Sequence, residues 1–162
     1  MQLEEKYQKI LKECQKRPEN RGCSDCTGRG NQYVVLDFNT FVCTTCSGIH
    51  REMQHKIKSV GMSTFTTEEI KAIDKGGNAL AKAQWMARYS ANDQPIPSEG
   101  EADKIRAHLK LKYQQKRWYS HNTAARRWVT VPRHWVSVTT PGASPARRSS
   151  SLQVLVWLVV QW

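Results

Sequence analysis

The apolar residues near the N-terminus recur three or four positions apart, which is the spacing of one face of an α-helix. The pattern runs from residue 2 to residue 17, where Pro18 ends it, so we predict an amphipathic helix. The apolar positions are Leu3, Tyr7, Ile10, Leu11 and Cys14. Cys14 has no second cysteine at the spacing of a metal-binding pair, so we interpret it as a small core residue.

A short β-hairpin is predicted after a loop. Residues 20–30 are rich in Gly, Asn, Ser and Asp, which indicates the loop. Residues 33–36 are β-prone, residues 37–40 contain a turn, and residues 41–42 begin a return strand. The hairpin joins two pairs of cysteines, so it would bring the pairs together.

Two weaker signals follow the hairpin. A helical turn is expected after Cys46 and through Arg51. Val60 and Met62 indicate one more short strand. We therefore expect a small sheet next to a short helix.

Capping boxes mark the starts of two later helices. Thr66 and Glu69 form the first, and its helix is expected to end at residues 76–77, which are both glycine. Ser98 and Glu101 form the second. A helix over residues 78–89 is predicted between them, before a linker that contains two prolines. The last helix is expected to turn these basic residues to solvent: Lys104, Lys110, Lys112, Lys116 and Arg117.

These elements predict an α+β domain in which a short central antiparallel sheet is surrounded by helices. The domain is expected to span residues 5–119. Residues 120–162 differ in composition, being rich in Ser, Thr, Pro and Arg without periodicity, and we expect a basic, disordered tail.

The charge of the chain is strongly basic. The 162 residues carry a net charge of +11, and 39% of them are hydrophobic, as in a globular protein. A basic surface favours an acidic protein face, an anionic membrane or nucleic acid as partner, and charge alone does not separate these.

The compartment follows from two signals. The N-terminus lacks the apolar stretch of a signal peptide, and the apolar run at residues 152–160 is too short to span a bilayer. We therefore expect an intracellular protein. In a reducing compartment its five cysteines favour metal binding over disulfides.

Four cysteines are predicted to bind one structural zinc ion. They form two Cys-x2-Cys pairs separated by sixteen residues: Cys23, Cys26, Cys43 and Cys46. Zinc takes four such thiolates in a tetrahedron, which leaves no open position for a reactive water. The fold is thus expected to be stabilised by zinc, and metal catalysis is disfavoured. A four-cysteine site alone does not specify a function.

The residues around the second cysteine pair are more specific. Residues 43–51, Cys-Thr-Thr-Cys-Ser-Gly-Ile-His-Arg, resemble the signature of the Arf GTPase-activating protein (ArfGAP) domain. Three later segments resemble the same family in the same order: His55 to Val60, Gly77-Asn78 with Trp85, and Lys112 to Arg117.

Two positions depart from the usual family pattern. Tyr33 stands where the family usually has tryptophan, and residues 62–65 replace its Leu-Asp-x-Trp. Both features resemble the divergent branch related to the FG-repeat-containing members.

The resemblance implies a GTPase activator with no catalytic turnover of its own. Its partner would be an Arf-type small GTPase in the GTP form, and Arg51 would be an arginine finger inserted in trans. The implied location is the cytoplasm, with recruitment to Golgi or endosomal membranes during vesicle trafficking. Ile49, His50, Lys56 and Lys58 are candidate partner-binding residues. Ile49 is also expected to pack into the core, and packing is favoured for His50.

Two alternatives remain open. A protein of this fold could bind a GTPase or trafficking partner without activating it. A zinc finger could also bind nucleic acid, but it would need a basic recognition helix after Cys46, and that segment offers one arginine and a glutamate. Nucleic acid is therefore ranked below a protein partner.

Overall fold

The structure is a computed structural model in which residues 2–121 are described. The predicted tail therefore lies, from residue 122 onward, outside the described residues. The first half contains α1 (Gln2–Lys16), the 3₁₀ turn η1 (Pro18–Asn20), β1 (Tyr33–Val35), β2 (Thr40–Val42), α2 (Thr44–Glu52) and β3 (Ile57–Ser59). The second half contains α3 (Thr67–Lys75), α4 (Asn78–Trp85), α5 (Ala102–Leu109) and the π-helical turn η2 (Lys110–Gln114).

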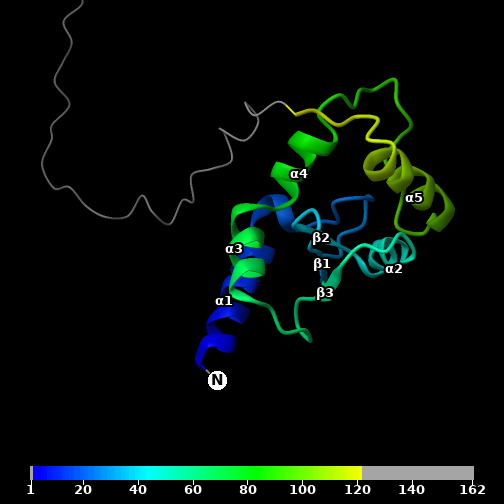
Figure 1. Cartoon of the computed structure of the whole chain (residues 1–162). Helices are drawn as coiled ribbons and strands as arrows, with labels where there is room; N and C mark the ends of the chain where they lie inside the picture. Colours follow the sequence, from blue (N-terminus) through cyan, green and yellow to red (C-terminus); the bar gives the residue numbers. More distant parts are fainter. Residues whose placement is uncertain (1, 122–162) are drawn as a thin grey trace, which may run out of the picture. The chain divides into compact units, whose positions relative to one another are not determined.

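The three strands form one antiparallel sheet in the order β2-β1-β3. Tyr33 of the central strand is paired with Val42 on one side and with Ser59 on the other. Figure 1 shows α1 and α3 together on one side of this sheet and α2 and α5 on the other. The predicted α+β class with a central antiparallel sheet is confirmed.

The sheet separates two hydrophobic cores because successive side chains of a strand point to opposite faces. Val34 and Phe41 face α1 and α3, where they pack with Leu11 and Ile73. Their neighbours Val35 and Val42 face α2 and α5, where they pack with Ile49, Ile105 and the second cysteine pair. Cys14 lies buried in the first core, which confirms its interpretation as a core residue.

Local signals predicted the first helices well. The capping box of α3 is present in both directions, with Thr66 accepting from the Glu69 amide and the Glu69 carboxylate accepting from the Thr66 amide. Asn20 and Asn78 then fix α4, because the Asn20 side chain accepts from the Asn78 amide and the Asn78 side chain accepts from the Phe41 amide. These asparagines join the start of α4 to the sheet.

Several predicted boundaries are wrong. The third strand is residues 57–59, and Met62 lies in the following loop with 85% of its surface exposed. The α4 helix ends at Trp85 rather than near residue 89. The box at Ser98 is half formed: its amide donates to the Glu101 carboxylate, but the N-cap of α5 is Glu101, without a side-chain cap, and the helix begins at Ala102.

The last predicted helix also changes character. It continues beyond Leu109 as the wider turn η2, and this turn carries Lys112 into the interior. The prediction that Lys112 faces solvent is therefore wrong. Lys112 lies seven positions after Ile105, on the buried stripe of the helix, and the prediction misplaced it because a charged side chain is usually exposed.

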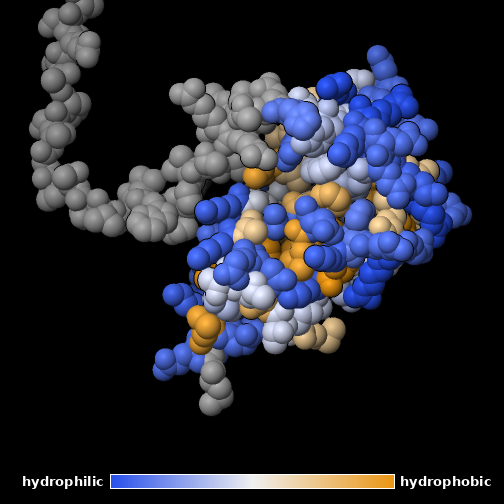
Figure 2. All heavy atoms as spheres, in the orientation of Figure 1, coloured by the Kyte–Doolittle hydropathy of each residue, from blue (hydrophilic) through white to orange (hydrophobic). Residues whose placement is uncertain are grey.

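The face shown in Figure 2 is mostly polar, with hydrophobic residues gathered near its centre and a few more at its edges. Within residues 2–121, none of the helices is long and apolar enough to cross a membrane.

Candidate metal site and the arginine beside it

The four predicted cysteines converge on one point. Their sulfur atoms all lie within 4.8 Å of one another. Cys23 and Cys26 come from the loop before β1, whereas Cys43 and Cys46 come from the junction of β2 and α2. Three of the four are buried, and Cys23 is half-buried.

The donor set fits a tetrahedral metal ion. Metal–sulfur bonds of about 2.3 Å in a tetrahedron place the sulfurs about 3.8 Å apart, and the Sγ atoms of Cys26 and Cys43 are 3.7 Å apart. Backbone amides already point at these sulfurs: Gly28 donates to Cys26, and Cys46 donates to Cys43. Such donors stabilise thiolate charge, so the cysteines are arranged as ligands rather than as disulfides.

Asp25, between the first two cysteines, is the centre of a buried network. Its carboxylate is fully buried and accepts from His50 Nε2 at 3.0 Å, Lys112 Nζ at 2.7 Å and the Tyr113 hydroxyl at 2.9 Å. Burial by itself raises the pKa of Asp25, but the Lys112 ammonium and the His50 hydrogen bond outweigh it and hold the pKa well below its usual range. Asp25 is therefore a buried carboxylate that joins three distant segments.

His50 extends this network toward the surface. Its Nε2 donates to the Asp25 carboxylate, which leaves Nδ1 to meet His55 Nδ1 at 2.8 Å. One proton lies between these two nitrogens, because a hydrogen bond needs one donor and one acceptor. Partial burial, together with His50, lowers the pKa of His55. The end of α2 and the loop after it are thus linked through the two rings.

Arg51 follows His50 in the last turn of α2, and it is exposed. Its guanidinium carbon lies 5.7 Å from the ring centroid of Tyr33 on β1. No ion pair of Arg51 is found within residues 2–121, so the charge is available to a partner. The next residue, Glu52, accepts from Arg106 of α5 at 2.8 Å. The arginine thus projects from a helix whose first turn carries two of the metal ligands.

The other predicted partner-binding residues lie in different environments. Ile49 and His50 are buried, with 3% and 0% of their surfaces exposed. The predicted packing of Ile49 in the core is confirmed, and this burial does not support a direct partner contact from either residue. Lys58 is engaged inside the domain, where it donates to Glu69 and lies over the Phe65 ring. Lys56 is exposed, so among the four it is the residue most available to a partner.

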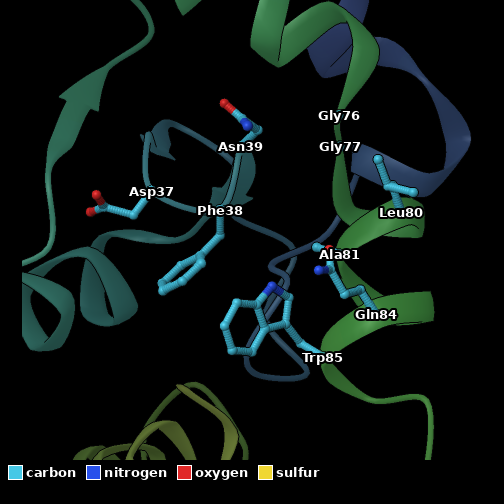
Figure 3. Close-up of a pocket in the computed structure, with 9 residues that line it drawn as sticks. All are labelled: Asp37, Phe38, Asn39, Gly76, Gly77, Leu80, Ala81, Gln84 and Trp85. Atoms are coloured by element: carbon cyan, nitrogen blue, oxygen red, sulfur yellow. The ribbon is translucent and has the colours of Figure 1, made fainter. Parts of the chain in front are cut away.

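Three aromatic side chains pack together next to the buried network: Phe38, Trp85 and Tyr113. Phe38 stacks on Tyr113, with centroids 4.0 Å apart, and meets Trp85 edge-on at 5.0 Å. Figure 3 shows the Phe38 and Trp85 rings near each other at a cavity of about 280 Å³ between the β1–β2 turn and α4. Its lining carries one ionisable side chain, Asp37, which accepts from the Lys56 amide. The cavity therefore has no constellation of catalytic groups.

Sequence reasoning missed the roles of Asp25, Lys112 and Tyr113. Asp25 looked like an ordinary loop residue. Its donors Lys112 and Tyr113 lie 87 and 88 positions further along the chain, so no local pattern indicates the contact. The resemblance of residues 112–117 to a family motif was the one signal that pointed to this segment.

Fold and site together define a four-cysteine metal-binding domain with an exposed arginine beside the metal ligands. The family model described as "ArfGap: Putative GTPase activating protein for Arf" matches residues 8–122. The chain belongs to this family.

Curated relatives agree with this assignment. The chain is 40% identical over 121 residues to "Probable ADP-ribosylation factor GTPase-activating protein AGD14" of Arabidopsis thaliana, covering 75% of this chain and 19% of that protein. It is 40% identical over 118 residues to "Arf-GAP domain and FG repeat-containing protein 1" of Homo sapiens, covering 72% and 21%. The chain thus spans about a fifth of the length of these relatives.

A solved structure matches the fold. The structure titled "ArfGap domain of HIV-1 Rev binding protein" aligns with a TM-score of 0.71 and 38% identity. The alignment covers 77% of this chain and 96% of that one. The predicted resemblance to the ArfGAP family, and to its FG-repeat-containing branch, is confirmed.

Proposed function

We propose that this protein activates GTP hydrolysis by an Arf-family small GTPase in its GTP form, and that Arg51 is the arginine it inserts. The observation that carries the proposal is the position of Arg51. It is exposed and unpaired within the described residues, at the end of a helix anchored by Cys43 and Cys46. Family membership and the names of the relatives give the partner class.

The chemistry suits an arginine. Hydrolysis by small GTPases is slow because negative charge on the phosphates is under-stabilised in the transition state, and an arginine supplied in trans accelerates it about 10³–10⁵-fold. This acceleration corresponds to an activation free energy that is lower by about 4–7 kcal/mol. A guanidinium is planar and always charged, so it can donate to two oxygens at once. The protein supplies the group, and the GTPase turns over the nucleotide.

We also propose that the metal is one zinc ion with a structural role. Four thiolates in a tetrahedron are the donor set of structural zinc sites, and they leave no position for a substrate or water. The cysteines come from two segments that flank the hairpin, so the ion would fix α2 against the loop before β1. Zinc would thereby hold the base from which Arg51 projects.

A single-turnover assay tests the activation. Arf loaded with GTP is mixed with excess protein, and phosphate release is followed for wild type, Arg51→Lys and the control Arg88→Lys. Arg88 is an exposed arginine outside the metal site. We expect wild type and Arg88→Lys to accelerate hydrolysis equally. The rate of phosphate release with Arg51→Lys should be at least about 100-fold lower. Equal stimulation by Arg51→Lys contradicts the finger role.

The same assay tests the adaptor alternative, which the replacement of the usual tryptophan by Tyr33 keeps open. An adaptor would bind GTP-loaded Arf, measured by isothermal titration calorimetry, without accelerating phosphate release. Nucleic-acid binding finds less support, because the last turn of α2 has Glu52 paired to Arg106 and His50 buried beside Arg51.

We further propose a cytoplasmic protein that reaches Golgi or endosomal membranes through its positive charge. Support comes from the net charge of +11 and from exposed lysines such as Lys56 and Lys104. Cosedimentation with vesicles containing 30% phosphatidylserine, against pure phosphatidylcholine vesicles, tests this. Equal cosedimentation with both would contradict the electrostatic basis.

A further inference from the structure

Arg51 lies between two residues that are both tied to the C-terminal segment of the domain. His50 precedes it and Glu52 follows it in the last turn of α2. Glu52 is bound directly by α5, through Arg106. His50 is bound indirectly by η2, because His50 and Lys112 share the Asp25 carboxylate. Figure 1 shows α5 running beside α2.

The link through His50 is buried. The His50 ring donates to one oxygen of Asp25, and the other oxygen accepts from Lys112 and Tyr113 of η2. Lys112 is 1% exposed and donates also to the Ser24 carbonyl at 3.1 Å. A buried ammonium and a buried carboxylate are expensive to separate, so this link tolerates little displacement.

Two successive residues of the π-helical turn reach one carboxylate. Lys112 and Tyr113 lie three and four positions after Leu109, and such positions share one stripe of a helix. Both side chains within the turn over residues 110–114 donate to Asp25. Single π-helical turns inside helices are frequent at functional sites.

The link through Glu52 lies at the surface. Arg106 donates to both carboxylate oxygens of Glu52, at 2.8 and 3.2 Å. Its third contact, to Asp103 at 2.7 Å, fixes the guanidinium along α5. Such an exposed pair contributes little stability. Its geometry, however, fixes the residue next to Arg51.

We infer that α5 and η2 act as a clamp that positions Arg51, with Lys112 as the principal positioning residue and Arg106 as a second one. Neither touches the nucleotide: they act through His50 and Glu52 on the helix turn that carries the arginine. The inference rests on the proposed GTPase activation. Its physical basis is that a displacement of about 1 Å in a catalytic group can cost about 100-fold in rate.

The test compares Lys112→Met with Lys110→Met in the full chain. Lys110 is an exposed lysine two residues away, so its replacement makes the same chemical change without touching Asp25. In the single-turnover assay we expect Lys112→Met to lower the maximal rate about tenfold or more. The protein concentration that gives half the maximal rate should stay within about twofold, because contacts with the GTPase surface remain. Lys110→Met should match wild type.

A second arm separates positioning from general damage. In an Arg51→Lys background, Lys112→Met should change the rate less than about twofold, because a clamp acts only through the group it positions. Equal losses in both backgrounds would overturn the inference, as would a Lys112→Met variant as active as wild type. Tyr113→Phe, which removes only the hydroxyl and keeps the ring on Phe38, is the milder variant if Lys112→Met fails to fold.

A readout independent of hydrolysis distinguishes this inference from the proposed function. The NMR signal of the Arg51 Nε–H reports how the guanidinium lies over the Tyr33 ring. The chemical shift of this signal should change in Lys112→Met and remain the same in Lys110→Met. If wild type fails to activate Arf but the signal shifts as expected, the proposed function fails and the positioning stands. An unchanged signal in Lys112→Met overturns the positioning.

Discussion

The guanidinium of Arg51 lies over the ring of Tyr33, with 5.7 Å between the guanidinium carbon and the ring centroid. The two residues come from different elements, since Arg51 lies in the last turn of α2 and Tyr33 begins the central strand. The contact holds a charge that has no ion pair within residues 2–121 close to the sheet, while leaving it exposed. It therefore limits the directions in which the arginine can project.

The first prediction concerns this ring. Replacing Tyr33 with leucine removes the cation–π contact, which is worth about 0.5–1 kcal/mol at an exposed site, whereas tryptophan keeps it. We expect Tyr33→Leu to slow activated hydrolysis about two- to fivefold and Tyr33→Trp to retain or exceed wild-type activity. The single-turnover assay measures both. A leucine variant as fast as wild type would show that the ring does not position the arginine.

The second prediction concerns the metal. Protein purified without chelator should contain one zinc ion per chain, as measured by inductively coupled plasma mass spectrometry. Because metal binding contributes about 10–16 kcal/mol to the folding of small zinc domains, chelation or Cys43→Ser should abolish cooperative unfolding. Cys14→Ala is the matched control, since Cys14 lies in the other core and should leave the zinc content unchanged. Zinc loss in that variant would contradict the four-cysteine assignment.

The third prediction concerns the end of α2. Gln54 terminates this helix with a φ of 63°, in the left-handed region that glycine adopts without steric cost. Its side chain is exposed, so replacement removes strain without opening a cavity. Gln54→Gly should raise the free energy of unfolding by up to about 1 kcal/mol, measured with urea. Gln114→Gly, an exposed glutamine without positive φ, should not stabilise the protein.

The fourth prediction concerns pH. Burial and the nearby Lys112 lower the pKa of His108, whose Nδ1 has no hydrogen-bond partner among the described residues. Below pH of about 6.5 the unfolded chain takes up this proton more readily than the folded one. Stability should therefore be complete above that pH and fall as the pH drops toward the lowered pKa.

His108→Leu should reduce the loss of folding stability at low pH. Urea unfolding midpoints at pH 7.5, 6.5 and 5.5, with zinc in excess, provide the measurement. Protonation of the cysteine ligands and of His55 contributes to both proteins, so the difference between them isolates His108. Parallel curves for the two proteins would show that His108 does not contribute.

Much of the fold was predictable from local patterns. The hairpin, the amphipathic α1 and the Thr66 capping box depend on residues a few positions apart, and sequence spacing encodes such geometry directly. The strand expected at Val60 and Met62 was misplaced by a few residues, because a three-residue strand gives too few positions for a periodicity.

Part of the candidate site was likewise predictable from local patterns, and part was not. Two Cys-x2-Cys pairs specify a metal site because a tetrahedral ion demands that geometry, so the sequence by itself determined the cluster and the exposed arginine five residues after it. Only the tertiary structure decided that Lys112 turns inward to Asp25 and that Asp25 also binds His50. A buried charge needs an opposite charge, and its partner can come from anywhere in the chain. Local pattern therefore located Arg51, and distant segments fix the helix turn that carries it.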